Sequence, residues 1–111
     1  MIKYESFNYF GNIPVLEVNG NIYINLLGKN LVCEDLFFPS DEHHVAYIGP
    51  QTSIAFIRKS DGLGFYFPPE EENVLYIVTP DIKKICNRSD LVVPIIISMY
   101  SENIYEASAL I

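Results

Sequence analysis

The segment Val74–Pro94, VLYIVTPDIKKICNRSDLVVP, constrains the fold of this chain more than any other stretch. Residues 74–78 are β-forming and carry no charge, which predicts a strand covered on both faces. Thr79 predicts a helix start, because its hydroxyl can accept hydrogen bonds from the amides of the first turn and a proline follows it. The segment therefore predicts a strand, a short helix over residues 80–87, and a second strand at residues 91–93.

The predicted helix has an apolar face and a charge pattern that suits its dipole. Its apolar residues have the i, i+3, i+4 spacing of one helix face and are Ile82, Ile85 and Cys86. Basic residues gather toward its end, where they offset the negative pole, and are Lys83, Lys84 and Arg88. Asn87 tolerates a left-handed conformation, so it predicts the helix stop.

Short apolar runs alternate with turn residues in the rest of the chain. We expect strands at residues 3–10, 13–18, 22–27, 31–33, 36–38, 45–48, 53–57, 63–67, 95–99 and 104–110. Asn19-Gly20 predicts a hairpin, since both residues adopt positive φ at little cost. The predicted fold class is therefore mainly β: one small domain over residues 1–111, a barrel or sandwich of short, mostly antiparallel strands, with the helix covering one end.

Composition excludes several classes of function. Of the 111 residues, 50% are hydrophobic and 19% are charged, so the chain can build a core, but its apolar runs are too short to cross a membrane. A net charge of −7 repels a phosphate backbone and argues against direct nucleic-acid binding. Cys33 and Cys86 stand among apolar residues, which favours buried free thiols. With no basic leader at the N-terminus, we expect a cytoplasmic protein.

One polar segment is the candidate for metal binding or catalysis. His43 and His44 lie near acidic residues, Asp35, Asp41 and Glu42, and imidazole with carboxylate suits a divalent ion. Adjacent side chains of an extended chain point in opposite directions, so both histidines cannot face one ion without a bend. We interpret the segment as a solvated loop and predict no metal, no other cofactor and no catalytic residue.

Basic and aromatic residues form the predicted ligand site. Arg58 and Lys59 are the densest basic pair outside the helix. Together with Arg88, Tyr47 and Tyr66 they define a rim for a small anionic ligand, on which the aromatic rings offer a stacking surface.

Two alternatives to this interpretation stay open. The basic residues could simply be solvated, and Arg88 could pair with Asp90 in the turn that follows the helix.

The eight tyrosines and seven phenylalanines exceed what a small core must hold, although core filling accounts for most of them. The excess predicts covered edges, and hence a homo-oligomer.

The runs Tyr76-Ile77-Val78-Thr79 and Arg88-Ser89-Asp90-Leu91-Val92-Val93-Pro94 resemble the closing half of a group of small phage and prophage proteins. Those proteins read Tyr-Ile-Val-Ser, a short helix and Arg-x-Asp-Leu-Val-Val-Pro before a final hairpin, and they open with Asn-Leu-Thr-Pro-His. Here the opening is at best Asn12-Ile13-Pro14, which lacks the Thr and His. The resemblance implies a mobile-element origin and a β-rich fold, and it carries no assigned activity.

These observations give three hypotheses for function. The first is a non-catalytic binding protein of a phage or mobile element that sequesters a small, nucleotide-like anionic ligand of the host, as an anti-defence factor. The second is an acidic protein–protein inhibitor or nucleic-acid mimic that presents acidic residues to a host protein, Asp41, Glu42, Glu70, Glu71 and Glu72. The third is a small hydrolase-type enzyme with His43 or His44 as its base.

Overall fold

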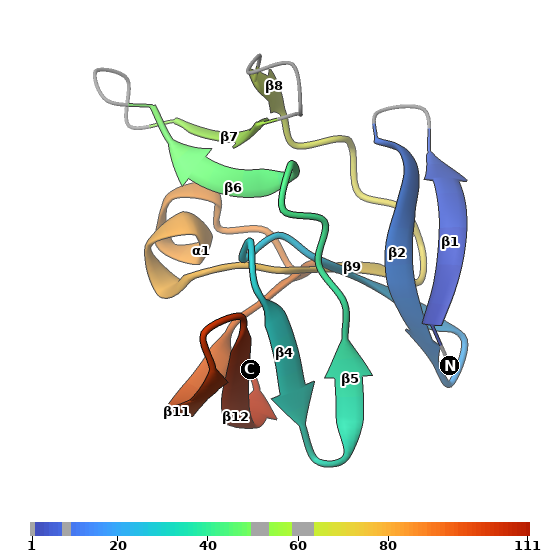
Figure 1. Ribbon diagram of the computed structural model, residues 1–111. Coiled ribbons are helices and arrows are strands. Elements are labelled where there is room, and N and C mark those ends of the chain that lie inside the picture. Colours follow the sequence, from blue (N-terminus) through green and yellow to red (C-terminus); the bar gives the residue numbers. More distant parts are fainter. Residues whose placement is uncertain (1, 8–9, 50–53, 59–63) are drawn as a thin grey trace.

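Three β-sheets and one helix make up the part of the chain that the computed structural model describes, residues 2–7, 10–49, 54–58 and 64–111 (Figure 1). The largest sheet has the order β1-β2-β3-β9-β10. Its strands are β1 (Ile2–Phe7), β2 (Gly11–Val18), β3 (Asn21–Asn25), β9 (Val74–Ile77) and β10 (Leu91–Val92). Strands β1, β2 and β3 pair antiparallel, whereas β9 runs parallel to both β3 and β10.

The predicted hairpin between β2 and β3 is confirmed. Val18 pairs with Asn21, so Asn19 and Gly20 alone form the turn. Both have positive φ, 52° and 83°, as a two-residue hairpin turn of type I′ requires.

The segment Val74–Pro94 forms a parallel β9–α1–β10 unit. Helix α1 (Pro80–Cys86) ends at Asn87 in the left-handed conformation, with φ 49°, as predicted. The predicted cap at Thr79 is wrong in one respect: its backbone is extended as a cap requires, but its hydroxyl donates to the Asp81 carboxylate and caps no amide. The predicted apolar helix face is also only partly covered, because Ile82 is buried whereas Ile85 is 40% exposed.

A four-stranded sheet lies at one side of the large sheet (Figure 1). Its order is β11 (Pro94–Ser101), β12 (Ile104–Leu110), β4 (Asn30–Cys33) and β5 (Leu36–Phe38). The β4–β5 turn consists of Glu34 and Asp35, both at positive φ. Strands β12 and β4 are parallel, although more than 70 residues separate their positions in the chain. The C-terminal hairpin of β11 and β12 therefore joins the earlier hairpin of β4 and β5 in one sheet.

A three-stranded sheet lies at the other side, next to α1 (Figure 1). It consists of β6 (Val45–Ile48), β7 (Ala55–Arg58) and β8 (Gly64–Tyr66), all antiparallel. Its strands alternate between inward and outward side chains, which is clearest in β7, where Ala55 and Ile57 are buried and Arg58 is exposed.

The large sheet has a hydrophobic core on each face. Along β9, Val74 and Tyr76 pack into a cluster with the three-stranded sheet and α1, whereas Ile77 packs into a cluster with the four-stranded sheet. Alternation along β2 divides Val15 and Leu16 between the same two clusters. The prediction that residues 74–78 form a strand covered on both faces is confirmed, and this strand lies at the centre of the molecule.

The predicted mainly β fold with one short helix is confirmed. Six of the nine strand pairs between the described residues are antiparallel, and the layered arrangement fits the sandwich alternative. In the described part of the chain each sheet has two edges, so the barrel alternative is wrong. Helix α1 packs into the core between the large sheet and the three-stranded sheet, so it closes no barrel end. Residues 8, 9, 53 and 63 of the predicted strands lie outside the described residues.

Candidate functional site

Three aromatic rings lie in a row across the outer face of the three-stranded sheet. The strand register pairs Phe56 with Tyr47 on one side and with Tyr66 on the other. The ring centroids are 5.7 Å apart for Tyr47 and Phe56, and 5.1 Å apart for Phe56 and Tyr66. Tyr66 is 66% exposed. The sheet therefore presents an aromatic surface that ends in a ring open to solvent.

Arg58 lies on the same outer face, two residues beyond Phe56 along β7. Its Cζ atom is 5.7 Å from the centroid of the Tyr47 ring, within the range of a cation–π interaction. Gly64 makes this arrangement possible, because a Cβ atom there would collide with the Tyr47 hydroxyl. Three of the five predicted ligand residues, Arg58, Tyr47 and Tyr66, are thus brought onto one surface.

A cavity of about 320 Å³ opens beside Tyr66. It is lined by Ile54, Ala55, Tyr66, Phe67, Ile85, Cys86 and Arg88. Its wall comes from the three-stranded sheet and from the end of α1, so the half-exposed Ile85 borders a cavity and not open solvent alone. The cavity places the predicted residues Tyr66 and Arg88 together, in a mostly apolar environment.

Arg88 is held in place by an ion pair with Asp90. Its Nε and Nη2 atoms donate to the two carboxylate oxygens of Asp90 at 3.0 Å and 2.6 Å. Asp90 is buried, and the bond to it raises the pKa of Arg88 above its ordinary value. The guanidinium also lies 5.7 Å from the centroid of Phe67. The alternative in which Arg88 pairs with Asp90 is confirmed, which leaves the two N–H groups of Nη1 and one of Nη2 for a further acceptor.

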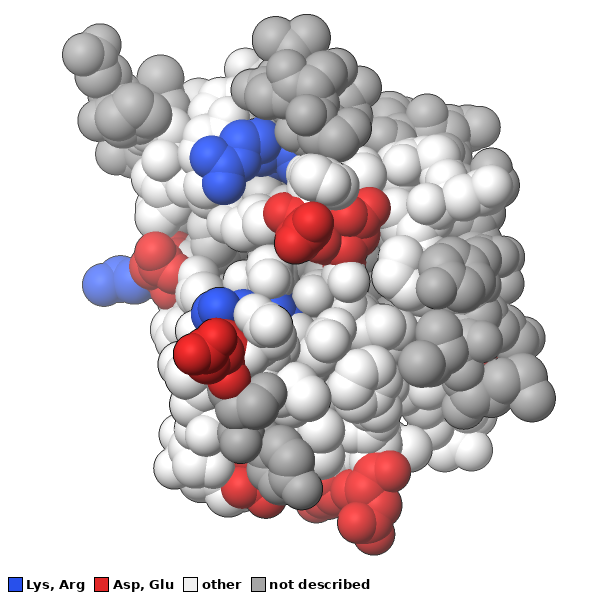
Figure 2. Space-filling model, in the orientation of Figure 1, with Lys and Arg blue, Asp and Glu red and all other residues white. Residues whose placement is uncertain are grey.

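The remaining predicted residue, Lys59, lies outside the described residues. The helix lysines Lys83 and Lys84 line a different cavity, of about 350 Å³, with Pro80, Val93 and Ile111. They are therefore separate from the aromatic surface. On the face drawn in Figure 2, basic and acidic side chains are interspersed among the coloured atoms, and no broad patch of one sign is seen.

The histidine segment differs from the predicted solvated loop. His43 is exposed, but His44 is 7% exposed, lies against the Phe10 ring at 5.8 Å and bonds through Nδ1 to Asp41 at 2.8 Å. The prediction is wrong for His44, because the β-turn around Asp41 directs this side chain into the core. Among residues 10–49, 54–58 and 64–111, no three histidine, cysteine or acidic side chains converge as a metal site would require.

Both cysteines are free, as predicted, but the prediction that both are buried is wrong for Cys86. Cys33 is buried in the core between the large and four-stranded sheets, and Cys86 is half-buried at the cavity beside Tyr66. Burial raises the pKa of both thiols. At neutral pH each is therefore a poor nucleophile.

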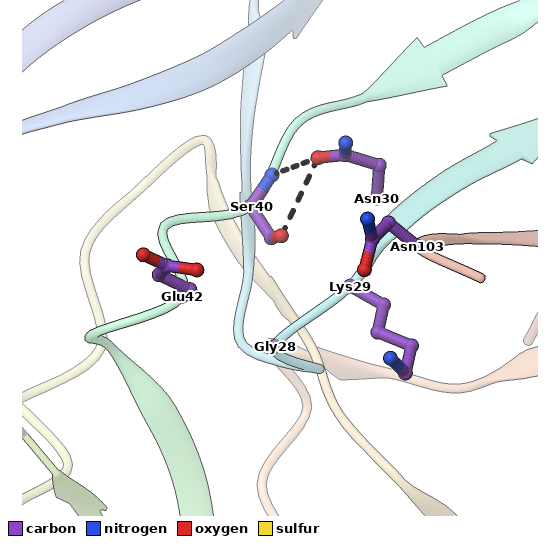
Figure 3. A pocket seen from close by; sticks show the side chains of 6 residues that line it. All are labelled: Gly28, Lys29, Asn30, Ser40, Glu42 and Asn103. Carbon is purple, nitrogen blue, oxygen red and sulfur yellow. Dashed lines mark hydrogen bonds between the residues drawn. The ribbon is translucent and has the colours of Figure 1, made fainter.

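A polar cavity of about 250 Å³ was not predicted (Figure 3). It is lined by Gly28, Lys29, Asn30, Ser40, Glu42 and Asn103. Figure 3 shows Ser40 turned toward Asn30, whose side-chain oxygen accepts bonds from the Ser40 amide and hydroxyl at 2.9 Å and 3.4 Å. The Lys29 ammonium extends away from this pair and donates to the Glu102 carbonyl at 3.0 Å.

Several polar groups that line this cavity already have hydrogen-bond partners within the protein. Next to the lining residue Lys29, the buried Asn25 amide donates to the carbonyls of Lys29 and Phe38, and its oxygen accepts from the Leu27 amide. These bonds join β3 to the loops around β4 and β5. The bonds to Leu27 and Lys29 are local, whereas the bond to Phe38 joins β3 to a strand 13 residues further along the chain.

No protein-family model, curated protein or solved structure matches this chain. The resemblance to small phage proteins therefore remains a prediction. In the described residues no helix has the length and hydropathy that a membrane span requires.

Proposed function

We propose that this chain is a non-catalytic binding protein that captures a small anionic ligand with a planar ring. The observation that carries the proposal is the cavity in which the open ring of Tyr66 and the guanidinium of Arg88 lie together. Its volume of about 320 Å³ is at the lower end of the range for small-molecule sites, so a ligand of mononucleotide size suits it.

Each part of the ligand has a partner in this arrangement. The ring would stack on Tyr66, and the row through Phe56 to Tyr47 keeps the Tyr66 ring in position. The anionic group would meet the remaining N–H groups of Arg88, which lines the cavity, or the guanidinium of Arg58, which lies at the Tyr47 end of the aromatic row outside the cavity lining; both are charge-assisted donors. Arg58 contributes more net attraction, because the charge of Arg88 is already balanced by Asp90.

The biological role follows from the resemblance in the sequence. A phage or mobile-element protein that sequesters a nucleotide-like signal of its host would act as an anti-defence factor without catalysis. The second hypothesis, an acidic inhibitor of a host protein, has one favourable observation: Glu70, Glu71 and Glu72 are all exposed on the loop before β9.

Calorimetry with a panel of mononucleotides and cyclic nucleotides tests the proposal. We expect one nucleotide to bind, and Arg58→Ala or Tyr66→Ala to weaken its binding roughly tenfold to a hundredfold, since each removes about 1.5–3 kcal/mol of interaction. Both side chains are exposed, so the fold should persist in these variants. Arg88→Ala is not suitable here, because it also removes the partner of Asp90.

A variant with Glu70, Glu71 and Glu72 replaced by glutamine is the matched control, and it should bind the nucleotide as the wild type does. No heat with any nucleotide would contradict ligand capture. If, in addition, capture of a host protein were salt-sensitive and lost in the glutamine variant, the acidic inhibitor would replace the present proposal.

A further inference from the structure

Strand β11 lies at the edge of the four-stranded sheet (Figure 1). It exposes a long apolar surface there. Four of its side chains are between 43% and 59% exposed, and they are Ile95, Ile96, Ile97 and Met99. Irregular pairing with β12 explains why consecutive isoleucines face outward, because register shifts at three places twist the strand. Within the described residues its outer edge has no neighbouring strand. Such an edge is a ready template for a further strand.

The charges of the chain indicate what covers this strand. The eight residues Pro94–Ser101 include no charged side chain, whereas the whole chain carries a net charge of −7. Two copies of an acidic chain repel each other wherever their carboxylates meet. Strand β11 itself carries none, although the Glu106 carboxylate of β12 accepts from the Ser98 hydroxyl at 2.8 Å and so lies beside the middle of the strand. An isologous pair also needs only this one surface, because a strand on a two-fold axis pairs with itself.

We propose that a second copy of this chain covers β11. The two β11 strands run antiparallel about a two-fold axis near Ile97 and Ser98, the middle of the strand. Their exposed isoleucine and methionine side chains pack against one another, and the free edges contribute main-chain hydrogen bonds. This inference is independent of ligand capture, because the aromatic surface lies on a different sheet.

Charges at the two ends of β11 complement each other in this arrangement. Lys84 lines the cavity with Val93 and Ile111, directly before the start of β11, and Glu102 is exposed in the turn directly after its end. Neither charged group makes a hydrogen bond or ion pair to another described residue. They cannot pair within one copy, because an eight-residue strand places its ends about 24 Å apart. Antiparallel pairing brings Lys84 of one copy to Glu102 of the other, twice.

The size of the surface sets the strength of the association. Together, the exposed parts of these four side chains correspond to the apolar surface of about two fully exposed side chains per copy. An interface built on one strand and its flanking groups belongs to the small class, below about 1,200 Å² in total. We therefore expect a reversible monomer–dimer equilibrium that depends on protein concentration.

Sedimentation velocity of the full chain, from micromolar to millimolar concentration, tests the proposal. We expect the wild type to shift from monomer to dimer across this range and Ile97→Glu to remain monomeric, because both copies would place a further carboxylate beside Glu106 near the two-fold axis. The matched control is Leu36→Glu, at an exposed apolar position on β5, the opposite edge of the same sheet. It should dimerise as the wild type does. Circular dichroism shows whether each variant is folded.

Charge reversal tests the antiparallel arrangement. Lys84→Glu and Glu102→Lys should each weaken dimerisation, and the double variant should restore it, since the exchanged charges again face each other. A wild type that stays monomeric, or an Ile97→Glu variant that dimerises normally, would overturn the proposal. A double variant no better than the single ones would overturn the antiparallel pairing.

Discussion

Replacement of Arg88 by alanine should destabilise this protein far more than loss of an ordinary surface charge. Arg88 balances the Asp90 carboxylate, which is 7% exposed, through two hydrogen bonds. The Asp90 carbonyl also accepts from the Tyr76 amide at 2.8 Å, so the ion pair lies where β10 joins the central strand β9. In Arg88→Ala the carboxylate is left buried without a counter-charge.

The expected cost follows from this burial. Removing one partner of a buried ion pair costs about 3–5 kcal/mol. The Arg88 side chain is 20% exposed, so water can reach the carboxylate in the variant, and we expect a loss near the lower end, about 3 kcal/mol. That is a large share of the roughly 5–15 kcal/mol that stabilises a typical domain. Arg88→Lys keeps the charge but not the bidentate geometry, so its cost should be smaller.

Urea unfolding followed by circular dichroism measures these losses. At a protein concentration where the chain is monomeric, Lys84→Ala removes the same charge from an exposed site nearby and should change the free energy of unfolding by no more than about 0.5 kcal/mol. The double variant Arg88→Ala with Asp90→Asn should be more stable than Arg88→Ala alone, because no charge is then stranded. A cost of Arg88→Ala no larger than that of Lys84→Ala, or a double variant less stable than Arg88→Ala, would show that Asp90 is not a stranded charge.

Two further predictions concern the thiols and a hairpin turn. Because burial raises the pKa of both thiols, alkylation of the native protein should be slow at neutral pH and accelerate only when the pH exceeds the ordinary pKa of a free cysteine thiol. Cys86 should be modified before Cys33, because it is only half-buried. Mass spectrometry with and without urea measures this, and rapid native labelling of Cys33 would contradict it. Replacing Glu34-Asp35, whose φ angles are 50° and 67°, by Asn-Gly should stabilise the hairpin by about 1 kcal/mol. Thermal unfolding measures it, and a lowered midpoint would count against this turn geometry.

The sequence determined the elements whose causes are local. The helix stop at Asn87 and the Asn19-Gly20 hairpin depend on backbone preferences of the residues themselves. The buried strand at residues 74–78 follows from an uninterrupted β-forming run. Arg58, Tyr47 and Tyr66 were named as ligand residues from their residue types alone, and their common face comes from the register of β6, β7 and β8.

Only the tertiary structure decided which neighbours these elements have. The parallel pairs of β3 with β9 and of β4 with β12 join segments that are distant in the chain, and no local pattern encodes them. The same holds for His44, which was expected in solvent and lies in the core against Phe10. The physical reason is common to all of them: burial and charge compensation depend on the groups that surround a residue in space, whereas sequence spacing fixes only its local conformation.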